Sequence, residues 1–133
     1  MRRLTKEEVK RCTKLLNWKY ETDQVTYWYV DELGKIQWRE WEEGHHRQVS
    51  LADILFTKLW DSICELAKKK WGKEAHVYVQ LDSQSYDKEF QAGAQRFVDC
   101  EHEEGHDAES NHPCLVLCEV IEKLKEIEAG EKG

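Results

Sequence analysis

The sequence predicts an α+β fold, in which a mainly antiparallel sheet is layered between helices in an α-β-α sandwich-like arrangement. Apolar residues recur at helical spacing near the start, in the middle and at the end of the chain. Between these segments, aromatic and β-branched residues alternate with polar ones, as in strands. The predicted order is therefore helix, strands, helix, strands, helix. The 133 residues have the size of one domain, predicted over residues 1–128, with residues 129–133 as a frayed tail.

The first two predicted helices begin with capping signals. The first begins at Thr5, which with Glu8 fits a capping box. The longest helix begins at Ser50, where Asp53 stands in the position of the capping partner. Gly72 suits its end, because glycine adopts the left-handed conformation in which many helices terminate.

The aromatic segment after the first helix predicts a meander of strands, over residues 18–22, 25–31 and 36–41. Alternation places Tyr27 and Tyr29 on one face of the second strand and Trp28 on the other. Gly34 supplies the positive φ for the turn before the third strand. A polar loop is predicted over residues 42–48.

The second half of the chain predicts further strands and a last helix. Residues 75–81 form an alternating strand, and residues 88–101 a strand pair or one long bent strand, with Gly93 marking a bulge or bend. An acidic surface loop is predicted over residues 101–112. Pro113 suits the first position of the last helix. The apolar positions predicted for that helix are Val116, Leu117, Val120, Ile121, Leu124 and Ile127.

Composition and charge limit the compartment and the partners. Five cysteines are an odd number without the spacing of a disulfide framework, which favours free thiols and a cytoplasmic protein. The formal net charge of −7 argues against nucleic acid as a partner, because phosphate binding depends on Lys and Arg. The longest apolar runs are too short to span a bilayer, so no membrane association is expected.

Three segments of the chain carry a family resemblance. They are LLNWKYETDQVTYWYVDELGKIQW, VSLADIL and NHPCLVLCEVIEKL, in that order. Together they resemble the phage ABA sandwich family, whose members are small domains of unknown function from phages and prophages. The resemblance implies an α-β-α layered fold and a phage or prophage origin, hence the cytoplasm of a bacterial host. It implies no activity, because the family has no catalytic residues to carry over.

A cluster of Cys and His residues in the stretch 100–118 raises the possibility of a zinc site. Loose forms of zinc-ligand spacing are present, although the strict Cys-x2-Cys pair is absent. The candidate ligands are Cys100, His102, His106, Cys114 and Cys118. The alternative is that no metal is bound and the helical cysteines belong to the core, since free Cys is among the most buried residue types. That alternative is the one favoured, and no cofactor is predicted.

A thiol enzyme is a third possibility. Cys100 beside His102, or Cys114 at a helix N-terminus near His112, would have a lowered thiol pKa if it were a nucleophile. Neither cysteine is accompanied by a recognisable nucleophile motif. The protein is therefore predicted not to be an enzyme.

An interaction protein is the function that remains. Five of the tryptophans, Trp28, Trp38, Trp41, Trp60 and Trp71, exceed what a small core usually needs, and Trp is enriched at the energetic centres of interfaces. The alternative is that the layers of the fold use all of them as core packing. Trp28, Trp38 and Trp41 are the candidate partner-binding residues. The predicted function is that of a small phage or prophage accessory protein that binds a protein partner or itself, one form of which is inhibition of a host or defence factor.

Overall fold

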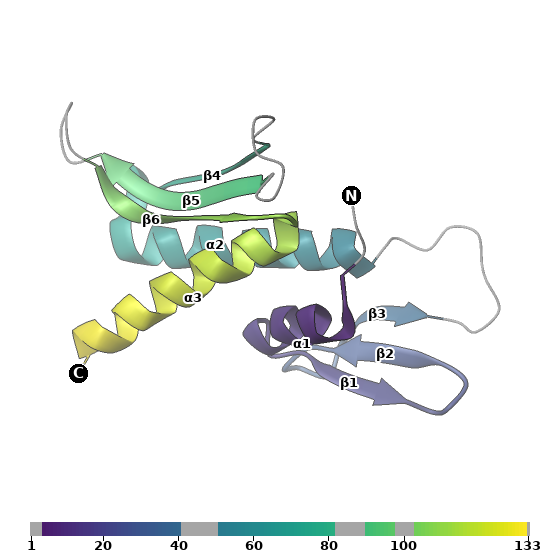
Figure 1. Ribbon diagram of the computed structural model, residues 1–133. Coiled ribbons are helices and arrows are strands. Elements are labelled where there is room, and N and C mark those ends of the chain that lie inside the picture. Colours follow the sequence, from purple (N-terminus) through teal and green to yellow (C-terminus); the bar gives the residue numbers. More distant parts are fainter. Residues whose placement is uncertain (1–3, 41–50, 82–89, 98–102, 133) are drawn as a thin grey trace.

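The computed structural model describes residues 4–40, 51–81, 90–97 and 103–132. Its fold is α+β, as predicted, and the helix–strand order follows the predicted one (Figure 1). The elements of the described residues are α1 (Lys6–Leu15), β1 (Lys19–Thr22), β2 (Tyr27–Val30), β3 (Ile36–Glu40), α2 (Leu51–Trp71), the 3-10 helix η1 (Gly72–Glu74), β4 (His76–Leu81), β5 (Phe90–Phe97), β6 (Glu103–Ser110) and α3 (Pro113–Lys132). The last helix thus extends into the residues predicted as a tail.

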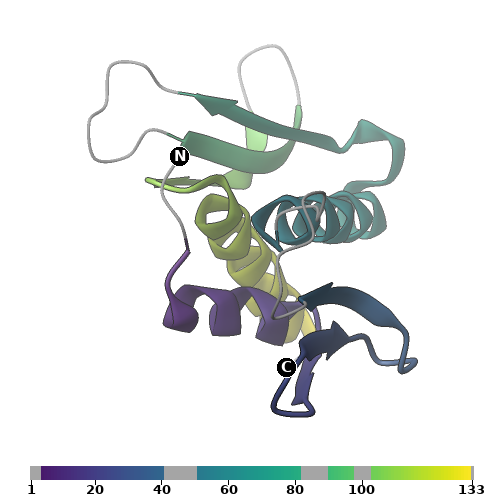
Figure 2. The ribbon, with the colours of Figure 1, turned by 90° about the vertical axis from the view of Figure 1, so that its right-hand side faces the viewer.

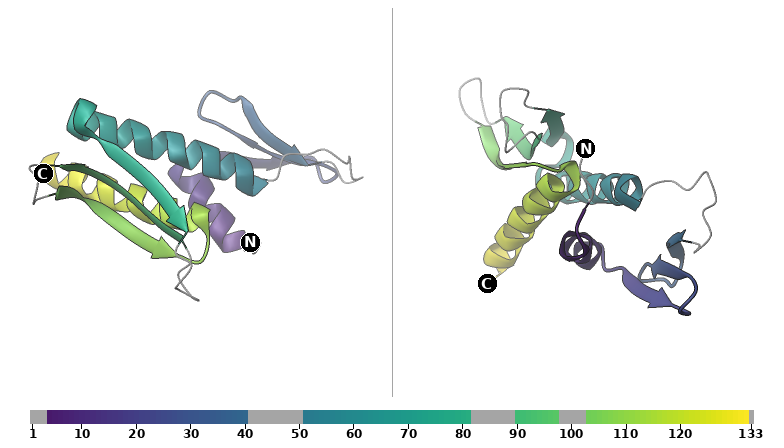
Figure 3. Two further views of the ribbon diagram at one scale, coloured as in Figure 1. Left: turned by 90° about the horizontal axis from the view of Figure 1, so that it is seen from above. Right: turned by 45° about the vertical axis from the view of Figure 1, so that its right-hand side comes forward.

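The strands of the described residues are divided between two antiparallel sheets. One has the order β1-β2-β3 and the other β4-β5-β6. The helices α2 and α3 lie in the middle, with the second sheet on one side and α1 with the first sheet on the other (Figures 1 and 2). The view from above shows the first sheet projecting at one end of α2 (Figure 3). The sequence indicated the strands but not their division into two sheets.

Local signals account for the start of α1 and for the turns of the first sheet. The backbone N–H of Glu8 donates to Thr5 Oγ1 over 3.2 Å and that of Thr5 to Glu8 Oε1 over 2.9 Å, which confirms the capping box. In the turn before β3, Gly34 has φ +80°, as predicted. The Asp31 carboxylate accepts hydrogen bonds from the backbone N–H groups of Leu33 and Lys35, both over 2.9 Å, which hold this turn in place.

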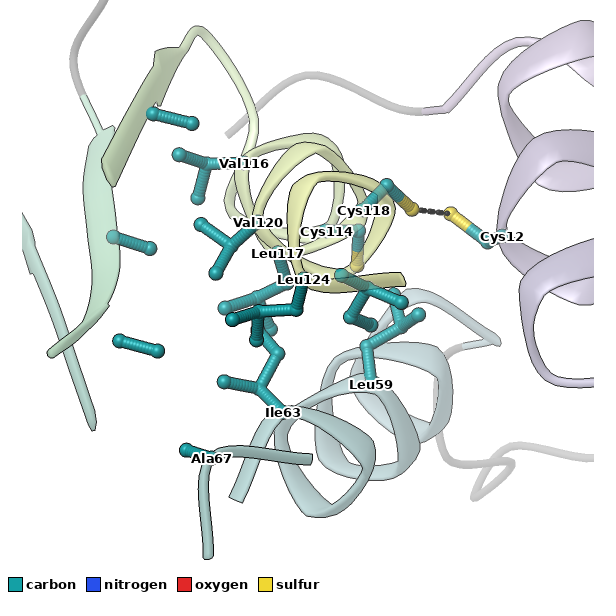
Figure 4. Close-up of a cluster of buried hydrophobic side chains, with 14 of the residues drawn as sticks. Cys12, Leu59, Ile63, Ala67, Cys114, Val116, Leu117, Cys118, Val120 and Leu124 are labelled. Carbon is teal, nitrogen blue, oxygen red and sulfur yellow. Dashed lines mark hydrogen bonds between the residues drawn. The ribbon is translucent and has the colours of Figure 1, made fainter. Parts of the chain in front are cut away.

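The core lies where α2 and α3 pack against each other and against the second sheet (Figure 4). From α2 it contains Leu55, Leu59, Ile63, Ala67 and Trp71, and from α3 Cys114, Val116, Leu117, Cys118, Val120, Ile121 and Leu124. The sheet contributes only small buried residues, Ala92, Ala94 and Ala108. Small strand residues allow the helices to approach closely, so the helices supply most of the apolar volume. No helix in the described part of the chain is long and apolar enough to cross a membrane.

Part of the predicted acidic loop is a strand. Residues 103–110 form β6, which pairs with β5 along its whole length, so the loop prediction is wrong there. Along β6, His106 and Ala108 are at least half-buried, whereas Asp107 and Glu109 are exposed. This alternation is that of a strand, but its inward residues are not large and apolar, so its hydrophobic signal is weak.

The pairing of β5 decides between the alternatives predicted for residues 88–101. Within residues 88–101, the described part forms one strand, β5, paired on one side with β4 and on the other with β6. Its register is continuous at Gly93, so there is no bulge at this position. A Cβ at this position would lie 2.7 Å from Tyr78 Oη, so Gly93 makes room for the ring on the neighbouring strand. Leu81, at the end of β4, is 65% exposed.

Candidate functional site

The first sheet carries a row of aromatic rings on one face. The register places Tyr20 opposite Tyr29 and Tyr29 opposite Trp38, and residues directly opposite each other share a face. Tyr27, two residues before Tyr29, shares it too, and Trp18 precedes Tyr20 by the same interval. We call these five residues the aromatic face. Neighbouring ring centroids are 5.6–6.4 Å apart, within the range of favourable aromatic contacts.

The aromatic face leads from the core outwards. Trp18 packs against the core cluster, and Tyr29 is only 9% exposed. Tyr27 and Trp38 are half-buried, and Tyr20 is 54% exposed. Burial raises the pKa of Tyr29, and the nearby Tyr20 adds to the effect, so the Tyr29 phenol stays protonated. The outer rings are therefore partly open to solvent while the inner ones anchor the row.

Other apolar side chains gather around the same sheet. Among the described residues, the large hydrophobic side chains that are exposed are Tyr20, Val25, Leu33, Ile36 and Leu81. All but Leu81 lie in the first sheet or in its turns. They are distributed over the sheet and both of its turns, and Tyr20 is the one that belongs to the aromatic face.

On the opposite face of this sheet, Trp28 has polar neighbours. The indole N–H of Trp28 donates to Glu21 Oε2 over 2.9 Å, and the Arg39 guanidinium lies 5.5 Å from the Trp28 ring centroid, at cation–π distance. The alternation predicted for Tyr27, Tyr29 and Trp28 is therefore confirmed. Of the predicted partner-binding residues, Trp38 lies on the aromatic face and Trp28 on the other face, and Trp41 lies outside the described residues.

The predicted zinc ligands within the described residues lie on two elements, β6 and α3. His106 is half-buried on β6, and Cys114 and Cys118 are fully buried on α3. Cys100 and His102 lie outside the described residues. In the part of the chain that the structure describes, no group of three or more His, Cys, Asp or Glu side chains is placed to hold a metal ion.

Cys114 does not have the environment of a nucleophile. Its Sγ donates to the Ala52 carbonyl oxygen over 3.3 Å, and burial raises the pKa of the Cys114 thiol to about 12. The neighbouring His112 is fully buried, but its Nδ1 accepts a hydrogen bond from the Cys114 backbone N–H over 3.0 Å. The imidazole thus caps α3, and the lowered pKa expected of a catalytic Cys114 is wrong.

Cys118 instead faces a second thiol. Its Sγ lies 3.4 Å from Sγ of Cys12 on α1, and both residues are fully buried (Figure 4). Either sulfur can donate the hydrogen bond between them, which lowers the pKa of Cys12 and, together with burial, raises the pKa of Cys118. Beside them, Arg11 donates to both carboxylate oxygens of Glu122 over 2.8 Å.

A pocket of about 420 Å³ opens between four segments of the chain. They are the start of α2, the end of β4, the start of β5 and the start of α3. Its lining is largely apolar and includes Phe56, Val79 and Phe90, with Asp53 and His112 among its polar residues. Among the described residues, the polar side chains that line this pocket form no arrangement that identifies a ligand.

Comparison with known proteins gives no relative. No family model, no curated protein and no solved structure matches this chain. The resemblance to the phage ABA sandwich family therefore remains a prediction.

Sequence reasoning missed two of these features. The sequence placed Tyr20, Tyr27 and Tyr29 in strands but did not identify them as part of one row of rings. The alternation of Tyr27 and Tyr29 did indicate that these two rings share a face. The Cys12–Cys118 contact joins residues 106 positions apart and has no local signal at all.

Proposed function

We propose that this protein binds other proteins, and that its aromatic face holds a short, proline-rich segment of the partner in the polyproline II conformation. The observation that carries the proposal is the row of five aromatic rings in mutual contact on a small projecting sheet. Three features support it: the size of the face, its chemistry and its rigidity.

The face is too small for a globular partner. Its strands have four or five residues, so at ~3.4 Å per residue they extend about 13–17 Å, and two inter-strand spacings of ~4.8 Å add about 10 Å across. The resulting area is on the order of 150 Å², far below the ~800 Å² that each partner buries in a standard stable complex. A short linear segment fits this area, whereas a second copy of the chain would need further surface.

The chemistry of the face matches a polyproline II ligand. Such a helix has no internal hydrogen bonds, so its carbonyl oxygens remain available as acceptors. Tyr hydroxyl and Trp indole N–H groups are suitable donors, and aromatic-lined grooves are a recurring receptor for proline-rich segments.

The face is also rigid. Each ring contacts at least one other ring, and Trp18 and Tyr29 anchor the row at its buried end. Aromatic side chains have few rotatable bonds, and rings that are already packed lose little conformational freedom on binding.

The setting of the proposal follows from the sequence. The phage ABA sandwich resemblance suggests a phage or prophage accessory protein in the cytoplasm of a bacterial host, and the free thiols at Cys12, Cys64, Cys114 and Cys118 suit a reducing compartment. Inhibition of a host or defence factor is one form that such binding takes. The net charge of −7 supports a protein partner over nucleic acid.

The test is binding of fluorescent proline-rich peptides, compared with a scrambled peptide of the same length in which proline is replaced by alanine. We expect Trp38→Ala to weaken proline-peptide binding by about tenfold or more, the size typical of an interface hot spot. Trp28→Ala, a Trp on the opposite face, is the matched control and should leave binding within about twofold. Circular dichroism of each variant checks that the fold is retained.

Two results would contradict the proposal. If proline peptides bind no better than the alanine peptide, the partner chemistry is wrong. If Trp28→Ala and folded Trp38→Ala weaken binding equally, the aromatic face is not the binding surface.

A further inference from the structure

The contact between Cys12 and Cys118 is independent of the aromatic face. The two sulfurs are 3.4 Å apart, and the residues belong to α1 and α3, two helices at opposite ends of the chain. Both side chains are fully buried, so the pair is removed from solvent in the folded state. We propose that Cys12 and Cys118 form a redox-sensitive dithiol, which a peroxide oxidises to a disulfide that locks α1 onto α3.

The geometry needs only a small adjustment. A disulfide has a sulfur–sulfur distance of about 2.05 Å, so the two sulfurs must approach by about 1.4 Å. The residues of α1 that are buried are Cys12 and Thr13, and the Arg11–Glu122 ion pair at its edge is more than one-third exposed at both side chains. Within α1 only Cys12 and Thr13 are buried, and Leu15 adds a partly buried contact with the core, so few contacts must change for the helix to move. It can therefore shift towards α3, or lift briefly to admit the oxidant.

The thiols divide the two roles of the reaction. Either sulfur can donate the hydrogen bond between them; when Cys118 donates, the bond favours the Cys12 thiolate, which is then the attacking sulfur. The Cys12 thiolate attacks one oxygen of hydrogen peroxide, the O–O bond breaks, and Cys12 becomes a sulfenic acid as hydroxide leaves and takes up a proton to form water. Cys118 then attacks Sγ of Cys12, the S–O bond breaks, and the departing oxygen takes up a proton to leave as a second water. Two thiols and one peroxide thus give one disulfide and two waters.

The consequence is a covalent link between distant parts of the chain. Cys12 and Cys118 are 106 positions apart, and a disulfide that closes so long a loop restricts the unfolded chain strongly. Because Trp18 follows closely after α1, the same link holds the base of the first sheet to the helical body. Oxidation should therefore stabilise the protein.

The test begins with fully reduced wild-type protein treated with hydrogen peroxide. We expect the intact mass to fall by two hydrogen atoms, peptide mapping to find Cys12 bonded to Cys118, and the melting temperature to rise by on the order of 10 °C. Dithiothreitol should reverse all three changes. Cys12→Ser and Cys118→Ser should each abolish the disulfide, whereas Cys64→Ser, at a half-buried thiol on α2, should leave it unchanged.

The wild-type mapping decides the proposal even if a serine variant fails to fold. A disulfide mapped to another pair of the five cysteines, or protein that stays folded and free of an intramolecular disulfide under peroxide, would overturn it. A Cys12–Cys118 bond that leaves the melting temperature unchanged or lower would overturn the locking role.

Discussion

Replacing Gly93 by alanine tests whether the glycine is needed for its backbone or for the space above it. Gly93 lies on β5 directly opposite Tyr78 on β4 and Asp107 on β6. A Cβ there would be 2.7 Å from Tyr78 Oη and 2.8 Å from Cε1 and Cζ of the same ring. Gly34 and Gly72 have positive φ, but Gly93 does not, so its backbone conformation is open to alanine.

The expected free-energy change is the balance of two opposing effects. Overpacking at a filled site costs about 1–3 kcal/mol, because the Tyr78 ring must leave its position. Replacing a strand glycine by alanine stabilises the folded protein by about 0.5–1 kcal/mol, since it reduces the conformational freedom of the unfolded chain. Gly93→Ala should therefore destabilise the protein by about 1 kcal/mol, or roughly 4 °C in melting temperature for a chain of this size. With Tyr78→Ala already present, only the favourable effect remains, and the same change should stabilise the protein.

The assay is urea unfolding of four proteins: wild type, the two single variants and the double variant. A coupling free energy of about 1–2 kcal/mol is expected between the two positions, typical of residues in direct contact. If Gly93→Ala costs the same in both backgrounds, the Tyr78 ring is not the obstacle. The glycine would then serve its backbone conformation, as the sequence first suggested.

Three further predictions concern the core, one turn and the thiols of α3. Leu117→Ala, at a fully buried site, should lower the free energy of unfolding in urea by about 2–5 kcal/mol. Leu33→Ala, at a site 93% exposed, is the control and should change it by no more than about 0.5 kcal/mol. Equal changes in the two variants would contradict the assigned core. Backbone hydrogen bonds, chiefly from Lys35, lower the pKa of Asp31 below its unfolded value, so its contribution is present above about pH 4 and is lost as the pH falls through the folded pKa. Wild type should melt above Asp31→Asn at pH 7 and converge with it in acid, and a gap that is constant with pH would refute this. Because the Cys114 and Cys118 thiols are buried and hydrogen-bonded, elemental analysis of purified protein should find no stoichiometric zinc, and a chelator should leave the melting temperature unchanged. Stoichiometric zinc whose removal by the chelator lowers the melting temperature would favour the zinc-stabilised alternative.

The features that the sequence predicted correctly depend on neighbours along the chain. The capping box at Thr5, the turn at Gly34 and the opposite faces of Tyr27 and Trp28 each involve groups a few residues apart. Such groups meet in any structure that forms the element, so spacing alone identifies them. The same reasoning predicted the helical segments and, from their alternation with strands, the α+β class.

The features that it missed depend on which segments become neighbours. The strand β6 has small or polar inward residues because the facing helices fill the core, so its own periodicity was too weak to recognise. For Gly93, only the pairing of β5 with β4 shows that a tyrosine ring occupies the space. The zinc hypothesis grouped cysteines that are close in sequence, but the tertiary structure directs Cys114 to α2 and Cys118 to α1.

By itself, the sequence determined the helices, most of the strands and the alternating faces of β2, because hydrogen bonds and side-chain periods act over a few residues. The tertiary structure alone decided that the strands divide into two sheets, that five aromatic rings contact one another in a row along the first sheet, and that Cys12 meets Cys118. Contacts between distant segments depend on how all elements pack together. Many alternative pairings would bury a similar apolar area, and only the packing of the complete core favours one of them.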